Sequence, residues 1–338
     1  MATLQDIADH LGLSRATVSR ALNDFPEVSA KTKTKVREAA KQLGYRPNLH
    51  ARKLITGRSG VVALLVQEEK NSLLDLSTDS FLGQLTQALA EHDLDLVVRL
   101  ISPSEKTEPY KRFATRNFVD CIIINAPHVD DYRIEALEEA GAKYVVHGRD
   151  IRHQGYAYYD IDNFGGAKQA ADYLCDLGHE RLAILLSDTN LAFAASRLDG
   201  FESAVAKHSG CSSELLIDEH QSHFAYSIAK RALSQADCPT AIYCANGLFQ
   251  ALGVYRAARE LGLRIPEDLS VIAHDDDISQ GQTNEFSPPL TVTRRPINDA
   301  CAPLAKMVLD LIEDKPAAKM QRVDSVELVV RGSTARKK

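Results

Sequence analysis

The stretch Gly12-Leu13-Ser14-Arg15-Ala16-Thr17-Val18-Ser19-Arg20-Ala21-Leu22-Asn23 decides the fold of the N-terminal part of the chain. Gly12 ends one amphipathic segment, and Ser14 is of the residue type that caps the start of the next helix. The earlier segment opens on Thr3 and Asp6, which have the spacing of a capping box, and it carries one apolar stripe. Two short helices joined by a tight turn with glycine form a helix-turn-helix.

A third amphipathic segment follows this pair and ends at Gly44. Its apolar stripe consists of Val36, Ala39, Ala40 and Leu43. Three short amphipathic helices can bury one small shared core, because each presents a single apolar face. We therefore predict an all-α domain over residues 1–47.

The start of the second predicted helix carries the side chains that would meet DNA, because a helix-turn-helix places this helix in the major groove. Arg15 can donate two hydrogen bonds to guanine, Ala16 can touch the methyl group of thymine, and Arg20 would face the same groove. Short donors suited to phosphate oxygens or to closing the turn are Thr17, Ser19 and Asn23. A solvated helix face explains the later lysines better than DNA contacts do: Lys31, Lys33 and Lys35.

The charge of the chain is unevenly distributed. Residues 1–60 contain eleven Lys and Arg against five Asp and Glu, a formal charge of +6. The remaining residues contain 29 basic and 41 acidic side chains, a formal charge of −12. A basic head on an acidic body indicates a polyanion partner for the head alone.

Length and composition favour a water-soluble protein with more than one domain. The 338 residues suit two or three domains, and 44% hydrophobic with 25% charged residues is ordinary for globular proteins. We find neither an apolar run long enough to span a bilayer nor a signal peptide, and we expect a cytoplasmic protein without membrane contact. The six cysteines lack metal-ligand spacing, so we interpret them as reduced, mostly buried side chains.

From Gly60 onward the pattern changes to apolar strands that alternate with helical segments. The clearest strands are 61–66, 94–98, 121–124, 144–146, 182–186, 241–244 and 269–273. Continuous apolar strands separated by helices imply parallel sheets covered on both faces, and so many units need two lobes. The predicted fold is therefore a small all-α helix-turn-helix head plus an α/β body of two parallel-sheet lobes.

The head resembles the LacI/GalR family of bacterial repressors over about sixty residues. The matching runs are Thr3–Ala8, Gly12–Asn23, Val28–Thr32 and Leu43–Asn48. The resemblance implies that Arg15, Ala16 and Arg20 set the operator sequence. It also implies that the following residues hold the DNA backbone: Thr3, Ser14, Thr17, Asn23 and Tyr45.

A hinge over residues 48–59 follows the head. The segment Asn48–Gly57, which includes Ala51, is barely two helical turns long and is marginal alone in water. The family resemblance implies that it folds when two subunits pair over the operator centre, and that Leu54 wedges into the minor groove. The alternative for Leu54 is a linker residue packed on the body. We therefore expect a homodimer on a two-fold-symmetric operator.

The resemblance continues more loosely through the body, residues 60–338, and implies lobes like those of periplasmic sugar-binding proteins. Among the matching runs are Ser196–Phe201 and Ile265–Val271. We expect the chain to cross between lobes near Tyr159, Pro289 and Gln321. Lobe 1 would then span about 60–159 and 290–320, and lobe 2 about 160–289 and 321–338.

A small-molecule effector site is expected where polar side chains end strands, because ligands of such sheets bind beyond the carboxyl ends of the strands. The resemblance implies that Asn125 contacts sugar and that Arg197 and Asp275 grip ligand hydroxyls. Further candidates are Asn246, Tyr158 and Asp160, with His147 and Arg149 weaker. Alternatives are that Arg197 pairs with Asp199, that Asn246 caps a helix, and that Tyr158 belongs to the core.

Two departures from the family pattern affect the expected pocket. Gly247 stands where the family usually has an acid, and Arg294-Arg295-Pro296 stands where it usually has a glutamine. The pocket can therefore differ from those of relatives in size or polarity.

The predicted function is a repressor whose operator affinity is controlled by an effector, with a sugar preferred. Alternatives are a corepressor, a purine effector, a solute-binding protein, an architectural DNA-binding protein or an enzyme. No phosphate loop or nucleophile elbow occurs, and we expect no catalytic residue, metal or cofactor. The adjacent residues Asp275, Asp276 and Asp277 cannot all converge on one metal ion.

Overall fold

A computed structural model describes residues 2–23, 25–45, 58–67, 76–115, 118–218, 225–275 and 286–337. The chain divides into two compact units. The first comprises Met1–Val61 with Asn117–Asp120, and the second comprises Val62–Arg116 with Cys121–Lys338. The predicted hinge residues Asn48, Ala51 and Leu54 lie outside the described residues.

The first unit contains three helices, α1 (Leu4–Leu11), α2 (Arg15–Leu22) and α3 (Ala30–Gln42). Thr3 and Asp6 form the predicted capping box, and Gly12 ends α1 in the left-handed conformation with φ of 64°. The Ser14 hydroxyl oxygen accepts a hydrogen bond from the Thr17 amide at 3.1 Å and thereby begins α2. These caps fix the turn of the helix-turn-helix.

The three helices bury one shared core. Its buried members are Ile7, Ala8, Val18, Ala21, Val36, Ala39 and Ala40. They come from all three predicted stripes, so each helix contributes its apolar face and leaves its polar face exposed. The all-α head is confirmed.

The first sheet of the second unit has the order β11-β5-β4-β3-β1-β2. The strands are β1 (Val61–Gln67), β2 (Asp95–Ile101), β3 (Cys121–Asn125), β4 (Tyr144–His147), β5 (Ala157–Ile161) and β11 (Gln321–Asp324). The register shows parallel pairing from β1 through β3, β4 and β5 to β11. All carboxyl ends of these paired strands therefore meet at one edge.

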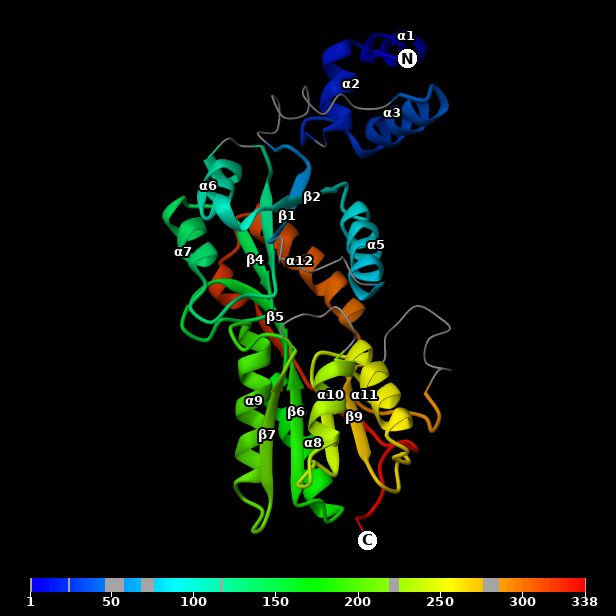
Figure 1. Ribbon diagram of the computed structural model, residues 1–338. Helices are drawn as coiled ribbons and strands as arrows, with labels where there is room; N and C mark the ends of the chain where they lie inside the picture. Colours follow the sequence, from blue (N-terminus) through cyan, green and yellow to red (C-terminus); the bar gives the residue numbers. More distant parts are fainter. Residues whose placement is uncertain are drawn as a thin grey trace. The chain divides into compact units, whose positions relative to one another are not determined.

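Helices cover both faces of this first sheet (Figure 1). On one face α5 (Leu76–Ala90) and α12 (Cys301–Ile312) pack on alternate strand residues, among them Leu64 and Ile123. On the other lie α6 (Glu108–Thr115) and α7 (Tyr132–Glu139). Short 3₁₀ turns occupy Pro103–Glu105, Ile297–Ala300 and Ala317–Lys319.

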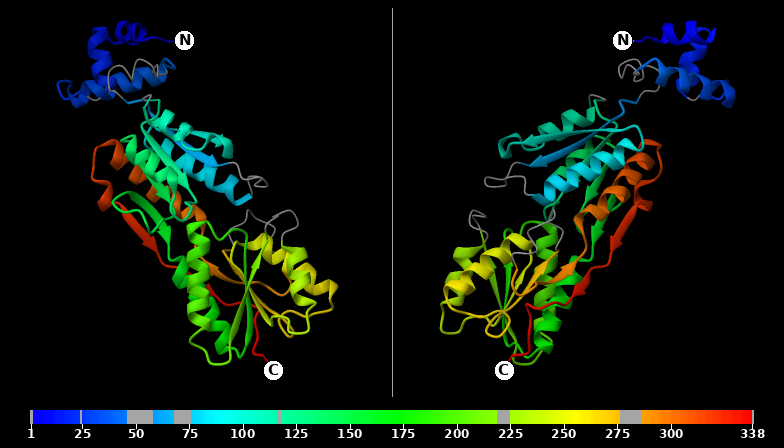
Figure 2. Two further views of the ribbon diagram at one scale, coloured as in Figure 1. Left: turned by 60° about the vertical axis from the view of Figure 1, so that its left-hand side comes forward. Right: turned by 90° about the vertical axis from the view of Figure 1, so that its right-hand side faces the viewer.

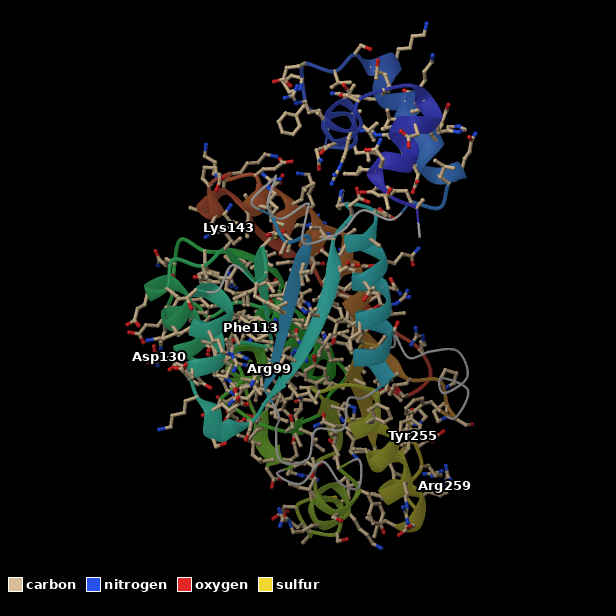
Figure 3. All side chains as sticks on the ribbon, turned by 90° about the horizontal axis from the view of Figure 1, so that it is seen from above. Arg99, Phe113, Asp130, Lys143, Tyr255 and Arg259 are labelled. Atoms are coloured by element: carbon tan, nitrogen blue, oxygen red, sulfur yellow. The ribbon has the colours of Figure 1, made fainter. Side chains whose placement is uncertain are left out.

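At the outer edge of this sheet, a cation–aromatic contact joins β2 to α6. The Arg99 guanidinium lies 5.8 Å from the centre of the Phe113 ring. Figure 3 shows these two side chains next to each other, and Glu105 pairs with the same guanidinium.

The second sheet repeats the strand order of the first, as β12-β10-β9-β8-β6-β7. The strands are β6 (Arg181–Leu186), β7 (Ser212–Ile217), β8 (Ala241–Cys244), β9 (Ser270–His274), β10 (Thr291–Arg294) and β12 (Glu327–Val329). All pairs are parallel except β10 with β12, which is antiparallel. Figure 2 shows the two sheets, each with its own helices.

Four helices cover the second sheet. α8 (Asn163–Asp176) and α9 (Ala192–Val205) pack on one face, and α10 (Tyr226–Leu233) and α11 (Leu248–Glu260) pack on the other. The two parallel-sheet lobes are as predicted. Within the described residues, every helix is too short or too polar to span a bilayer.

The chain crosses between the sheets at places that differ from the expected boundaries. β10 (Thr291–Arg294) belongs to the second sheet and β11 (Gln321–Asp324) to the first, so the crossings follow Ile161, Arg294 and Asp324. The reason is that Pro288 and Pro289 precede a strand rather than end one, because proline is tolerated before a strand begins. Each crossing lies a few residues later than expected.

Close packing of α8 on α9 depends on Gly200. A Cβ atom there would lie 2.2 Å from the carbonyl oxygen of Phe164, whereas a Cβ at Gly83 in α5 would meet nothing within 4 Å. We expect Gly200→Ala to lower the free energy of unfolding by about 1–3 kcal/mol through overpacking. Urea denaturation measures this, with Gly83→Ala as the helical control, which should be neutral or stabilising by up to about 1 kcal/mol. Equal behaviour of the two variants would contradict the packing argument.

Candidate functional site

The carboxyl ends of both sheets border one cavity of about 340 Å³. Its wall is formed by residues just after β3, β4, β8, β9 and β10, by the end of β5 and by the first turns of α9 and α11. The strand order changes direction between β1 and β3 and between β6 and β8, which is where sheets of this type bind ligands. Five of the six predicted effector residues line it: Asn125, Asp160, Arg197, Asn246 and Asp275.

Arg197 is the buried cation of the cavity wall, with 6% of the residue exposed. Its Nε donates to Asn163 Oδ1 at 2.8 Å, and its Nη1 donates to the carbonyl oxygen of Ala245. The guanidinium lies 4.8 Å from the centre of the Phe193 ring. These bonds, and not a pair with the exposed Asp199, fix the arginine. Its Nη2 donates to no described residue, so this donor is left for a ligand.

Asp160 and Asn163 extend this polar network behind Arg197. Asn163 Nδ2 donates to Asp160 Oδ1 at 3.1 Å, and the other carboxylate oxygen lies 3.5 Å from Arg149 Nε. Burial disfavours the charged carboxylate and raises the pKa of Asp160 to about 6. Asp160 therefore changes its charge close to neutral pH.

Asn125 and His147 end adjacent strands β3 and β4 and contact each other. His147 Nδ1 and Asn125 Oδ1 are 2.8 Å apart, and the imidazole stacks on Phe81 with ring centres 4.9 Å apart. Burial lowers the pKa of His147 to about 4. The histidine is therefore neutral at physiological pH, and its Nδ1 donates to the asparagine oxygen.

Asn246 is held by the neighbouring strand end and does not cap α11. Its Nδ2 donates to Ser187 Oγ at 2.9 Å, and its Oδ1 accepts from the Ser187 amide at 3.3 Å. The Asn246 amide donates to Gln250 Oε1 at 2.9 Å. Both ends of the side chain are thus fixed, and its edge lines the cavity.

Asp275 follows β9 in the left-handed conformation, with φ of 61°. Its amide donates to the Thr293 carbonyl at 2.7 Å, which holds the residue at the strand end. His274, just before it, is buried, and burial lowers its pKa well below the usual value. Among the described residues no group of His, Cys, Asp and Glu could hold a metal ion; Asp276 and Asp277 lie outside them.

The structure does not bring Tyr158 to the cavity; Tyr159 lines it instead. Successive side chains of a strand point to opposite faces, so the two tyrosines of β5 face different ways. Tyr158 lies against Tyr156, with ring centres 5.6 Å apart, and beneath the Arg149 guanidinium at 5.8 Å. Tyr158 thus lies outside the cavity lining, which begins at Tyr159 and continues through Asp160 and Ile161 toward the carboxyl end of β5.

The sequence analysis missed several cavity residues. They are Phe193, Phe249, His274, Arg295 and Ile297, together with Asn163. Each ends a strand, directly follows one or stands in the first turn of a helix, and that position is the available signal. Arg295 was noted only as a departure from a family pattern.

The predicted DNA face of the head is exposed. Arg15, Ala16 and Arg20 project from α2 with exposed side chains. Thr3 and Ser14 cap helices, and Asn23 Nδ2 donates to the Ser19 carbonyl at 2.8 Å and closes the end of α2. Tyr45 packs half-buried against the head core. Their contacts with DNA stay a prediction.

Comparison with known proteins gives two family matches. A model described as bacterial regulatory proteins, lacI family, matches residues 3–48. A model described as a periplasmic binding protein-like domain matches residues 171–334.

Full-length relatives agree with these matches. The HTH-type transcriptional regulator AglR of Rhizobium meliloti (strain 1021) is 36% identical, and the match covers 98% of this chain and 94% of AglR. The HTH-type transcriptional regulator CelR of Thermobifida fusca is 30% identical, with 98% of each chain covered.

Solved structures share the fold. The CelR–cellobiose complex superposes with a TM-score of 0.71 at 27% identity, covering 98% of this chain and 100% of that one. The lac repressor dimer bound to operator and the anti-inducer ONPF gives a TM-score of 0.80 at 24% identity, covering 99% of both chains.

The raised pKa of Asp160 predicts a pH-dependent contribution to stability. Because the folded-state pKa lies above that of the unfolded chain, protonated Asp160 stabilises the fold at low pH, and this contribution is lost as the pH rises through about 6. The free energy of unfolding should fall less between pH 4 and pH 7 in Asp160→Asn than in the wild type, by up to about 3 kcal/mol. Urea unfolding at several pH values measures it, with the exposed Asp199→Asn as control. The same pH profile in wild type and Asp160→Asn would refute the assignment.

Proposed function

Because the chain belongs to the LacI family of bacterial transcription regulators, we propose that it is a repressor that binds a two-fold-symmetric operator as a homodimer and releases it when an uncharged saccharide occupies the cavity. A regulator that binds an operator would act in the cytoplasm. Ligand and operator would bind to distinct sites, and each would weaken the other by the same factor.

Arg197 carries the assignment of the effector site. It is buried, it is fixed by two hydrogen bonds, and Nη2 is left without a described partner at the cavity wall. A ligand oxygen at the cavity wall could accept a hydrogen bond from this nitrogen, and a hydrogen bond to a charged donor is stronger than a neutral one. A preorganised donor of this kind favours ligand binding, because little order is lost when the ligand arrives.

The charge of the cavity wall favours an uncharged ligand. The wall has two arginines, Arg197 and Arg295, and two acids, Asp160 and Asp275. Arg295 pairs with Asp299 and Asp324, and burial keeps both lining histidines neutral. A phosphate or carboxylate would find no surplus of positive charge in this wall.

The remaining lining suits a saccharide. Phe193, Phe249 and Tyr159 offer aromatic surface, while Asn125 and Asn246 offer amide groups that both donate and accept. Such a mixture of apolar surface with a few fixed polar groups is typical of small-molecule sites. The complex of the related CelR with cellobiose supports the same class of ligand.

A thermal-shift screen of the purified full chain tests this proposal. The panel contains neutral mono- and disaccharides, their phosphates, hexuronates and purines. A ligand at about 100 times its Kd stabilises the native state by about 2.7 kcal/mol, which gives a clear rise in Tm. We expect neutral saccharides to give the hits. Hits confined to phosphates, uronates or purines would contradict the proposed ligand class.

Arg197→Ala should abolish the Tm shift caused by the ligand and the release of operator, while ligand-free operator binding persists. The physical reason is the loss of the buried Arg197 guanidinium at the cavity wall. Calorimetry and operator gel shifts measure the two effects after circular dichroism has verified folding. Arg181→Ala is the control, because Arg181 begins β6 and so lies at the end of that strand away from the cavity. A normal ligand response in Arg197→Ala would place the effector elsewhere.

Arg15→Ala should relax the preference for one base pair of each half-site, at a cost of about 1–3 kcal/mol for the preferred base. Selection from random DNA, followed by binding titrations, measures the preference. The exposed Lys31→Ala in α3 is the control, and we expect it to leave the selected sequence unchanged. An unaltered consensus for Arg15→Ala would refute its reading of bases.

A further inference from the structure

The three segments that cross between the sheets meet at one carboxylate, that of Asp324. Asp324 ends β11 at the third crossing and does not line the cavity. Two cavity-lining side chains, Tyr159 at the first crossing and Arg295 at the second, bond to it. Asp324 is thus separated by 165 residues from one partner and by 29 from the other.

Tyr159 is the partner from the first crossing. Its hydroxyl donates to Asp324 Oδ2 at 3.0 Å, and the residue is 1% exposed. The centre of the Tyr159 ring lies 6.2 Å from that of His147 and 5.6 Å from the Arg322 guanidinium. Since the ring is enclosed, the hydroxyl position fixes the part of the cavity wall that Tyr159 forms.

Arg295 is the partner from the second crossing. Its Nη2 donates to the same oxygen, Asp324 Oδ2, and its Nε lies 3.3 Å from Asp299 Oδ2. Arg295 lines the cavity, with 27% of its side chain exposed, while Asp324 binds its guanidinium on the side away from the cavity. One carboxylate oxygen therefore serves both crossings.

Arg322 keeps Asp324 charged from within β11. Its Nε donates to Oδ1 at 2.8 Å and its Nη2 donates to Oδ2 at 2.9 Å. These bonds lower the pKa of Asp324 below its usual value. Hydrogen bonds to an ionised carboxylate are stronger than neutral ones, and this carboxylate is largely shielded, with 14% of its side chain exposed.

We propose that Asp324 is the positioning residue of the hinge between the lobes: its carboxylate holds Tyr159 and Arg295 in the cavity wall and ties the first two crossings to the third. This hinge between the lobes comprises residues 159–163, 293–297 and 321–327 and is distinct from the predicted hinge over residues 48–59. The role of this carboxylate in a response to ligand rests on the proposed function, whereas the contacts within the hinge do not. A ligand that touches Tyr159 or Arg295 would act on the same carboxylate.

The alternative is a local ion pair that stabilises the end of β11 through Arg322 alone. The two interpretations differ in which segments of the chain they expect to be destabilised when Asp324 is replaced. A local pair affects residues 321–327, whereas a joint of three crossings affects segments that are far apart in the sequence. Local opening of each segment can be measured by amide hydrogen exchange.

Hydrogen exchange with mass spectrometry on the ligand-free full chain tests the proposal. In Asp324→Asn we expect exchange to accelerate about tenfold in all three hinge segments, since hydrogen bonds to a charged acceptor are lost in each. In Arg322→Gln we expect acceleration within residues 321–327 only. Asp268→Asn, which removes an exposed carboxylate bonded to Arg264, controls for loss of charge and should leave the hinge unchanged.

A double-mutant cycle measures whether Tyr159 and Asp324 act together on hydrogen exchange, which a purely local role of Asp324 would not produce. If Tyr159 acts through Asp324, Tyr159→Phe should accelerate exchange of residues 159–163 in the wild-type background but add nothing in the Asp324→Asn background. Additive effects would overturn the proposal. So would acceleration in Asp324→Asn confined to residues 321–327. Neither result depends on the saccharide or the operator, so failure here is distinct from failure of the proposed function.

Discussion

Burial of both faces of each parallel sheet is the constraint on which the functional architecture depends. The strands of each lobe have helices on both sides, so their interior residues are mostly apolar. The buried polar residues Ser270, Thr291 and Thr293 are hydrogen-bonded. Polar side chains can then face open space at the strand ends. Because the paired strands are parallel, their carboxyl ends gather at one edge, and the two edges border one cavity.

Burial also determines the chemistry of that cavity. It keeps His147 and His274 neutral, raises the pKa of Asp160 to about 6 and requires that Arg197 be hydrogen-bonded. Buried charges are costly unless they are paired, so the residues behind the wall matter as much as those in it. Asn163 illustrates this, because it links Asp160 to Arg197.

The crossings connect this chemistry to movement. Each lobe has its own core, so a change in lobe orientation must be absorbed by the segments that join the lobes. Those segments carry two cavity residues and meet at a charged carboxylate. A regulator that responds to a ligand needs such a connection, since coupling requires contacts that differ between two states.

The sequence by itself determined the elements with strong local signals. Caps and glycine turns identified the head, and apolar runs identified the central strands, because these features depend on neighbouring residues alone. The strand-end rule also located Asn125, Asn246 and Asp275 in the candidate site, whereas Arg197, which lies within α9, was indicated by the family resemblance.

Tertiary structure alone decided the edge strands of the sheets, the side chains that line the cavity and the contacts between residues far apart in the sequence. Strands β7 (Ser212–Ile217) and β11 (Gln321–Asp324) escaped prediction because edge strands are largely exposed and lack an apolar run. Tyr159 lines the cavity and Tyr158 does not, because the cavity lies at the carboxyl end of β5 and Tyr158 stands further from that end. Asp324 meets Tyr159 across 165 residues, and no local pattern records a contact that only the folding of two lobes brings about.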